Sequence, residues 1–421
     1  MRFNHLRSTL KTAVLVTTVL LLGAGLALGQ VTVPLSAGPS TALLPDGSSV
    51  PMWGYSCDGG ATANCRALNP ASVGWSPVVI TVPTGQALTI HLTNNLSFAG
   101  GNIPTSLTIV GQLGGGLGTQ RTTTSSPDHT NAQGAVTWPI VDPTTSGTPP
   151  AQGPRVQSFS TEVAVGTPTD LTWSNLRPGT YLLESGTHPS IQGPMGLYGM
   201  VVVTTPPATA LSPFTAYPGV TYNADAQLLF SEIDPAQNRY VDDVVNTAGF
   251  SETTVWSGQV GTCGDVTVTA PHMHTCYPPA VNYKPLYYLI NGAAFDKTHA
   301  LASVFPTFPS AVLSPTGSVL VRLVNAGLRM HVPSIVGSQT GAPAVPGFGL
   351  IAEDGNPLPG VTRVQSEVFM AAGKTYDVKI NVPAAGGTAL PIFDRELSLS
   401  GNAVARDAGN AALCANQARR D

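Results

Sequence analysis

The stretch that decides the fold is Gly179–Gly199, which reads GTYLLESGTHPSIQGPMGLYG. Its first part, Thr180–Glu184, combines threonine, tyrosine and leucine and predicts a β-strand. A Gly-Pro pair at 193–194 then interrupts the chain before the apolar run Leu197–Val203, which predicts a second strand. The stretch therefore has the strand-turn-strand pattern of an all-β protein.

The composition of the whole chain agrees with this local pattern. The 421 residues include 45 glycines and 37 prolines, 42% are hydrophobic, and only 10% are charged. Average chains carry about a quarter charged residues. Short strands joined by Gly/Pro turns give this profile, so we predict β-sandwiches and no long helix. A formal net charge of −4 with few basic residues argues against a nucleic-acid partner.

The N-terminus has the features of an export signal. Arg2, Arg7 and Lys11 precede the apolar run Ala13–Leu28, and a small-x-small triplet follows as a cleavage site. We therefore predict a signal peptide over residues 1–29 and a chain that is secreted, periplasmic or at the cell surface. A membrane anchor is the alternative; after cleavage no membrane span is expected.

The cysteines fit an oxidising compartment. Cys57 and Cys65 flank a short loop, as do Cys263 and Cys276, and both pairs suit local disulfides. Cys414 is left without a partner. Buried free thiols are the alternative for each pair, and only the second pair has histidines nearby for a metal site.

Strand and turn signals divide the mature chain into two units. We predict domain 1 over residues 31–203, a linker over 204–213, domain 2 over 214–400 and a disordered tail over 401–421. Both units follow the same succession of short strands and turns.

The strand predicted at 88–94 allows a test of the β-sandwich interpretation. Leu88, Ile90 and Leu92 alternate with polar residues, so they are expected on one buried face. His91 is expected on the outer face. We also expect Leu197 and Tyr198 to lie in the face shared by the two domains.

Several motifs carry a resemblance to multicopper oxidases. The segment 179–199 resembles the end of their first cupredoxin domain, where a Tyr-His-Ser-His copper motif precedes a Gly-Leu-Tyr-Gly strand. Tyr288–Gly292, Val321–Gly327, Ile351–Gly355 and Ala372–Val378 resemble, in the right order, turn and strand motifs of the second domain. The resemblance implies two tandem cupredoxin-like Greek-key β-sandwiches.

Within that family, the chain is most similar to large bacterial multicopper proteins assigned to manganese oxidation. The Glu-Ser-Gly-Thr phrase and Arg363–Thr375, RVQSEVFMAAGKT, carry this similarity. It implies copper as cofactor, oxidation of Mn(II) or phenolic substrates by one-electron transfer to O2, and downstream cupredoxin domains or another copper-bearing chain as partner.

The copper ligands of that family do not align with histidines here. The alignment places Thr108, Val110, Glu184 and Gly186 at four ligand positions, and no His-Cys-His phrase occurs in the chain. Blue and trinuclear copper centres depend on cysteine and histidine. We therefore predict no catalytic residue in this chain and no oxidase activity from the chain alone.

One His-x-His phrase remains as a candidate metal site. In a strand, His272 and His274 would project to one face, with Cys276 two residues further on, a set that suits Cu(I) or Zn(II). A Cys263–Cys276 disulfide would remove the thiolate. An exposed loop pair of histidines is the alternative.

Other titratable residues have weaker patterns. Glu184 and His188 are an acid–base or metal pair, or else a strand-end carboxylate and a surface imidazole. His331 is expected to pack or hydrogen-bond in the core. Asp242 and Asp243 are adjacent, so we predict a solvated turn.

The tryptophans allow a sugar-binding or aromatic-binding surface. For Trp53, Trp75 and Trp173, however, burial in the core is the expectation.

Three functional classes follow from these observations. The chain is the N-terminal part of a copper oxidase, a non-catalytic cupredoxin pair with a binding or structural role, or a copper-handling protein that uses His272 and His274. The Ala-rich end at 410–421 leaves the sandwich pattern. We expect a truncated or frameshifted form of a longer oxidase, with a natural two-domain protein as the alternative.

The disulfide assignment can be tested directly. We expect mass spectrometry of non-reduced peptides to find Cys57 linked to Cys65 and Cys263 linked to Cys276, because short loops in an oxidising compartment favour local pairing. Alkylation before digestion is the control for reshuffling. Labelled thiols at these four positions would contradict the assignment.

Overall fold

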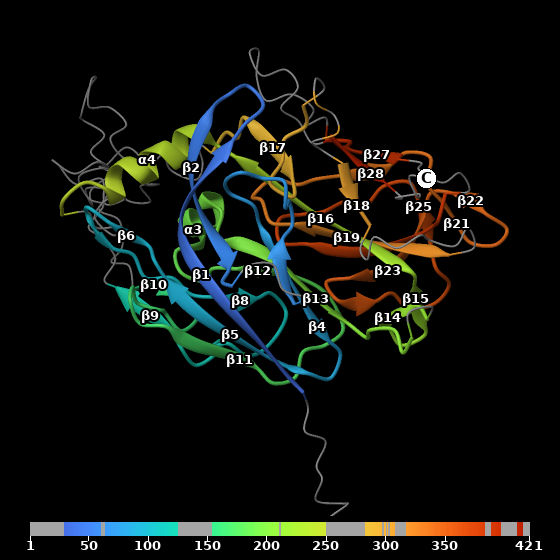
Figure 1. The fold of residues 1–421 in the computed structure, drawn as a ribbon, viewed down its shortest axis with the longest axis horizontal. Helices are drawn as coiled ribbons and strands as arrows, with labels where there is room; N and C mark the ends of the chain where they lie inside the picture. Colours follow the sequence, from blue (N-terminus) through green and yellow to red (C-terminus); the bar gives the residue numbers. More distant parts are fainter. Residues whose placement is uncertain are drawn as a thin grey trace, which may run out of the picture.

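The computed structural model describes residues 29–59, 64–124, 154–209, 212–249, 283–296, 299, 301, 304–307, 317–383, 389–396 and 411–415. Strands dominate these residues, and the helices among them, α3 and α4, are short (Figure 1). No helix in this part of the chain is long and apolar enough to cross a bilayer. Residues 1–28 of the predicted signal peptide lie outside it.

Two sheets form the first domain. One has the order β11-β5-β1-β2 and the other β3-β4-β13-β12-β8. Their bounds are β1 (Gln30–Leu43), β2 (Ser49–Cys57), β5 (Ala87–Asn94), β11 (Thr169–Trp173), β3 (Cys65–Ala67), β4 (Val78–Pro83), β8 (Thr108–Ile109), β12 (Gly179–Glu184) and β13 (Tyr198–Thr204). Two short ribbons accompany them, β6 (Ser97–Phe98) with β7 (Gly101–Asn102) and β9 (Thr122–Thr124) with β10 (Arg155–Ser158).

The second domain repeats the plan. Its main sheet has the order β17-β16-β19-β26-β23-β24, with β25 also paired to β23, and a second sheet has the order β18-β28-β27-β20. Their bounds are β16 (Ala224–Ile233), β17 (Tyr287–Ile290), β19 (Ser318–Asn325), β23 (Phe348–Glu353), β24 (Asn356–Pro357), β25 (Val364–Gln365), β26 (Thr375–Asn381), β18 (Val304–Pro306), β20 (Pro333–Ile335), β27 (Ala389–Asp394) and β28 (Ala411–Ala415). The remaining ribbons are β14 (Phe214–Tyr217) with β15 (Val220–Tyr222) and β21 (Gln339–Thr340) with β22 (Val345–Pro346).

Each of these sheets takes its strands from one side of residues 205–213. On that basis we propose the domain limits given by the sequence, 31–203 and 214–400, joined by 204–213. The second domain also includes β28, beyond the predicted limit at residue 400, because this strand pairs with β18 and β27.

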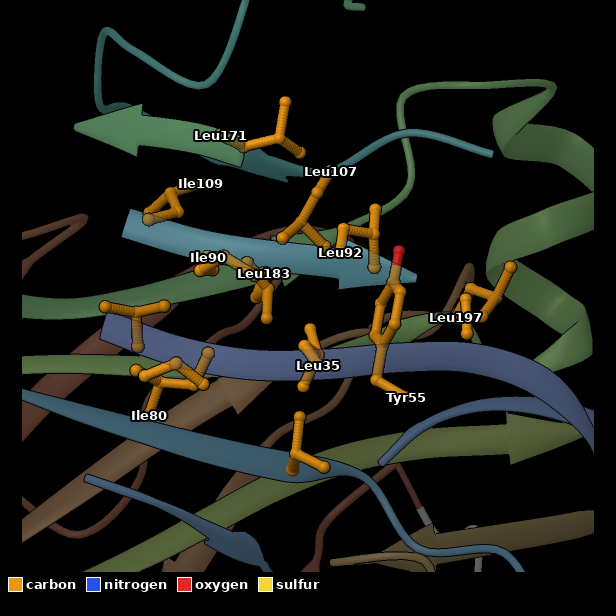
Figure 2. Close-up of a cluster of buried hydrophobic side chains, with 14 of the residues drawn as sticks. Leu35, Tyr55, Ile80, Ile90, Leu92, Leu107, Ile109, Leu171, Leu183 and Leu197 are labelled. Carbon is orange, nitrogen blue, oxygen red and sulfur yellow. The ribbon is translucent and has the colours of Figure 1, made fainter. Parts of the chain in front are cut away.

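The core of the first domain confirms the predicted alternation. Leu88, Ile90 and Leu92 are fully buried on one face of β5, and Figure 2 shows Ile90 and Leu92 within the cluster that fills the space between the sheets. His91 projects outward, as predicted, and its Nδ1 lies 2.6 Å from Asp170 Oδ1 on β11. Burial of this face removes large apolar side chains from water and stabilises the sandwich.

The prediction of a turn at Asp242 and Asp243 is wrong. Both residues lie in helix α4 (Pro235–Val245). Asp234 caps the helix by accepting hydrogen bonds from the next backbone N–H groups, and proline occupies the first helical position. Val241 and its neighbours in the last turn pack against the core of the first domain. Because this apolar face is buried against the first domain, the segment forms a helix and not a solvated turn.

One segment of the predicted disordered tail, residues 401–421, forms a strand, and the rest lies outside the described residues. Ala411–Ala415 form strand β28, which pairs with β18 on one side and β27 on the other. The backbone of β27 offers a row of N–H and C=O groups along which the added strand pairs. β28 is therefore stabilised by pairing with a sheet edge, which the local sequence does not reveal.

The two domains share an apolar face. Tyr198 on β13 packs there with Leu229, Leu289 and Val324 of the second domain. The prediction for Tyr198 is therefore confirmed, whereas Leu197 is wrong: it lies in the interior of the first domain. Leu197 immediately precedes β13, and adjacent residues of extended chain point to opposite sides, so the two do not share one face.

A buried arginine lies at this same boundary. The side chain of Arg322 on β19 is fully buried. Its Nε donates to Asp225 (2.6 Å), and its terminal nitrogens donate to Thr180 Oγ1 (2.9 Å) and Tyr222 OH (2.8 Å). Thr180, on β12 of the first domain, donates in turn to Asp377 (2.6 Å). The hydroxyl of Thr180 thus links the two domains through a charged cluster.

This cluster makes a stability prediction. Thr180→Val should lower the free energy of unfolding by about 1–3 kcal/mol, because it leaves buried partners without a hydrogen bond. Arg322→Met should cost about 3–5 kcal/mol, since two buried carboxylates lose their counter-charge. Urea denaturation measures both.

Thr32→Val on the exposed face of β1 is the matched control for the threonine substitution. If Thr180→Val were as stable as that control, the hydroxyl would not hold the domains together.

Candidate functional site

Pairing of β8 with β12 brings the aligned ligand positions together. Thr108 lies directly opposite Glu184 in the register, and its hydroxyl donates to the Glu184 backbone oxygen at 3.2 Å. A Cβ added to Gly186 would lie 3.0 Å from the Thr108 methyl group. Val110 is 38% exposed. Three of the four positions therefore converge, as the resemblance implies.

Hydroxyl groups fill the space around these positions. Thr187 Oγ1 lies within hydrogen-bond distance of Ser106 Oγ (3.0 Å) and Ser158 Oγ (3.2 Å). The backbone N–H of Gly186 also donates to Ser106 Oγ at 3.0 Å. Ser106, Ser158 and Thr187 are fully buried. Buried polar groups of this kind must be paired with one another, because water does not reach them.

A second set of buried groups centres on Gln192. This residue belongs to helix α3 (Pro189–Met195), and its Oε1 accepts from Thr105 Oγ1 (2.8 Å) and Ser185 Oγ (2.7 Å). Its Nε2 donates to the Pro104 carbonyl at 2.8 Å. We call the combined set of Thr105, Ser106, Ser158, Ser185, Thr187 and Gln192 the hydroxyl network. Sequence reasoning missed it, although Thr-Ser at 105–106 and Ser-x-Thr at 185–187 flank the aligned positions.

The Glu184 carboxyl stands beside this network in a poorly hydrated place. Burial raises the pKa of Glu184 to about 7, since removal from water disfavours the charged form. Burial is the cause of this shift, and among the described residues no hydrogen bond or ion pair joins the Glu184 carboxylate to His188. The proposed Glu184–His188 pair is therefore not formed. Instead, His188 begins helix α3 with left-handed backbone angles, φ 40° and ψ 61°.

A second buried titratable group is His331, predicted to hydrogen-bond in the core. The prediction is confirmed: its Nδ1 lies 2.7 Å from Asp394 Oδ2 and its Nε2 3.4 Å from Glu232 Oε2. Burial acts to lower the pKa of His331, but the hydrogen bonds and charges of the two carboxylates raise it to about 9. Both carboxylates also accept backbone N–H bonds, from Arg329 for Glu232 and Val332 for Asp394. All three side chains are inaccessible, so the triad is structural.

The cysteine predictions are confirmed in one case. Cys57 and Cys65 form a disulfide that joins β2 to β3. Cys263, Cys276, His272 and His274 lie outside the described residues, so the second disulfide and the His-x-His metal site stay predictions. The predicted burial of Trp53, Trp75 and Trp173 is confirmed.

The donors at the aligned positions do not fit copper. A hydroxyl, an aliphatic side chain, one carboxylate and a glycine replace the imidazole and thiolate groups that copper centres use. Across the described part of the chain, no three His, Cys, Asp or Glu residues converge as a metal site. A side chain on Gly186 would also press on the Phe159 ring, 3.0 Å from its Cβ.

Comparison with known proteins places the fold. The chain matches no protein-family model, and no curated protein sequence matches it significantly. The copper nitrite reductase from Nitrosomonas europaea superposes with a TM-score of 0.51 at 14% identity, covering 93% of this chain and 95% of that chain. The fold is cupredoxin-like.

The blue copper oxidase from Nitrosomonas europaea gives a TM-score of 0.48 at 16% identity over 91% of this chain and 85% of that chain. Identities this low establish the fold alone. The predicted all-β class of cupredoxin-like sandwiches is confirmed, and the structures that resemble it include multicopper oxidases.

The raised pKa of Glu184 makes a pH prediction. Between the ordinary glutamate value of about 4.5 and the folded value of about 7, the folded state holds a proton that the unfolded state releases. Stability therefore falls as the pH rises through this window. Glu184→Gln should remove the fall and stabilise the protein at pH 8 by on the order of 3 kcal/mol relative to its effect at pH 4.

Urea denaturation at pH values from 4 to 8 measures the difference. Glu396→Gln, at an exposed glutamate after β27, controls for the loss of one negative charge. A difference between Glu184→Gln and the native chain that stays constant with pH would contradict the raised pKa.

Proposed function

We propose that this chain is an exported pair of cupredoxin-like domains whose role is binding or structural support, and that its first domain does not carry copper. The observation that carries the proposal is the hydroxyl network beside the positions that align with the copper ligands of the resembled family. The family resemblance supplies the scaffold, and the side chains at the site supply different chemistry.

The energetics of the network support a structural role. Each buried hydrogen bond contributes about 1 kcal/mol, whereas a buried polar group left unpaired costs more. Thr105, Ser185 and Gln192 satisfy one another at 2.7–2.8 Å. A metal ion entering here would have to break these bonds, and hydroxyl and amide groups are poor ligands for copper. The network therefore stabilises the strand ends without a metal.

Because of Glu184, this site differs from one in which only apolar side chains replace the copper ligands. Its carboxyl group is neutral over part of the physiological pH range, because burial raises its pKa to about 7. A protonated carboxyl can donate a hydrogen bond, and an ionised one attracts a cation. One carboxylate alone binds a metal weakly, so it does not restore the lost site.

Oxidation of Mn(II) or phenolic substrates remains a proposal that needs copper ligands from elsewhere. Downstream cupredoxin domains or another copper-bearing chain would supply them. Copper handling by His272 and His274 is the alternative within this chain, favoured by the shared face that two imidazoles at i and i+2 would have in a strand.

Copper content tests the proposal. The purified chain, incubated with Cu(II) and separately with Cu(I) and then desalted, is expected to hold far less than one copper per chain. It should show no intense blue absorption and no oxidation of Mn(II) or a phenol. Mass spectrometry of the metal and optical spectra measure these quantities.

His272→Asn with His274→Asn is the matched variant. Stoichiometric copper in the native chain that disappears in this variant would favour copper handling instead. Copper retained by the variant, together with turnover of a phenol, would show that the aligned positions do not describe the metal site.

A further inference from the structure

A cavity of about 640 Å³ lies on the outer face of the first domain. Its floor is the hairpin of β1 and β2, which run side by side (blue in Figure 1). It lies on the far side of these strands from the apolar core, because Ser36 and Gly38, which line it, alternate with the buried Leu35 and Ala37 along β1. The hydroxyl network is not part of its lining.

The floor is open because its side chains are small. Gly38 lies opposite Gly54 in the register, and Ser36 lies opposite Ser56. Ser40 continues the row along β1. Gly54 completes this row of glycines and serines, which leaves room above the backbone of the two strands. Pro39, Tyr55 and Cys57 of the same strands also border the cavity.

The wall of the cavity is held in place by covalent and packing contacts. Trp75 packs over Gly54, where an added Cβ would lie 2.8 Å from the indole Cδ1, and its Nε1 donates to the Gly196 carbonyl at 3.3 Å. The Cys57–Cys65 disulfide ties the floor strand β2 to the wall strand β3. The cavity is therefore preformed, which lowers the entropy cost of binding a ligand.

The lining combines apolar side chains such as Trp75 and Val78 with polar groups, and its charge has one sign. Ser40, Ser56 and Asn95 present hydroxyl and amide groups, and Arg66 is the charged residue among the lining groups that the structure describes. Arg66 donates to the Ala67 carbonyl and to Gln227 Oε1 of the second domain, which fixes the guanidinium at the cavity edge. Two acids stand close to the lining without being part of it: the charge of Asp225 acts on Arg66, and Asp58 accepts from Ser36 Oγ at 2.8 Å.

We propose that this cavity binds a small hydroxylated carboxylate of the sugar-acid class. The guanidinium of Arg66 attracts the carboxylate, for which planar arginine is well suited. The hydroxyls of Ser40 and Ser56 and the amide of Asn95 face the ligand hydroxyls. A volume of about 640 Å³ is within the usual range of small-molecule sites. This proposal is independent of the role of copper.

Binding of D-glucuronate compared with D-glucose tests the proposal, because the two sugars differ in the C6 carboxylate. Isothermal titration calorimetry on the purified chain should show D-glucuronate binding at least about tenfold more tightly than D-glucose, the effect of one charge-assisted hydrogen bond. Equal affinities, or no binding of either sugar at millimolar concentration, would overturn it.

Variants then locate the bound sugar acid. Gly38→Leu should fill the floor and abolish binding, since an added Cβ at Gly38 meets only the Asn95 Cβ at 3.5 Å and the backbone is not strained. Thr32→Leu, on the same exposed face of β1 outside the cavity, is the matched control. Arg66→Gln should weaken D-glucuronate binding about tenfold and leave the weaker D-glucose binding unchanged.

Thermal unfolding of each variant distinguishes loss of the site from loss of the fold. If Gly38→Leu unfolds at the native temperature and still binds D-glucuronate, the sugar acid lies elsewhere and the proposal is wrong. The same conclusion follows if Arg66→Gln, equally stable, binds D-glucuronate with native affinity.

Discussion

The buried guanidinium of Arg322 is the constraint on which the relation of the two domains depends. A fully buried charge is tolerated only when counter-charges and hydrogen-bond acceptors surround it. Asp225 on β16 and Asp377 on β26 flank it within one sheet, and Thr180 reaches it from the other domain. Burial acts to lower the pKa of Arg322, but Tyr222, Asp225 and Asp377 raise it above the ordinary value, so the charge persists. The sheet register and the domain contact must therefore form together.

The same strand connects this cluster to the candidate site. β12 carries Thr180 at one end and Glu184 at the other. Residues between them alternate: Leu182 packs into the interface of the domains, whereas Tyr181 and Leu183 enter the core of the first domain. Anchoring one end of β12 in the arginine cluster thus fixes the position at which Glu184 meets Thr108. When one end of a rigid strand is fixed, the residues at its other end have little freedom to move.

The hydroxyl network and the His331 triad both satisfy the hydrogen bonds of buried polar groups, but with different kinds of group. The hydroxyl network uses neutral donors and acceptors, whereas the triad of His331, Asp394 and Glu232 uses charges. Burial acts to raise the pKa of Asp394, but the hydrogen bond and charge of His331 and two backbone N–H groups lower it. Both centres pair their polar groups internally and bring together residues that are distant in the chain. Neither of these two centres contains the set of imidazoles that a copper site needs.

The sequence by itself determined the fold class, because alternation along strands such as 88–94 and glycine-proline turns are local properties that one segment carries. Through the family resemblance it also predicts which positions correspond to the copper ligands, and that Thr108 and Glu184 occupy two of them. Tertiary structure decided the rest. Helix α4 forms because Val241 finds an apolar surface on the other domain, and β28 forms because β27 offers an open edge. The partners of Gln192 and His331 come from residues far apart in sequence, since hydrogen bonds and burial depend on distances in space that only the packed sheets establish.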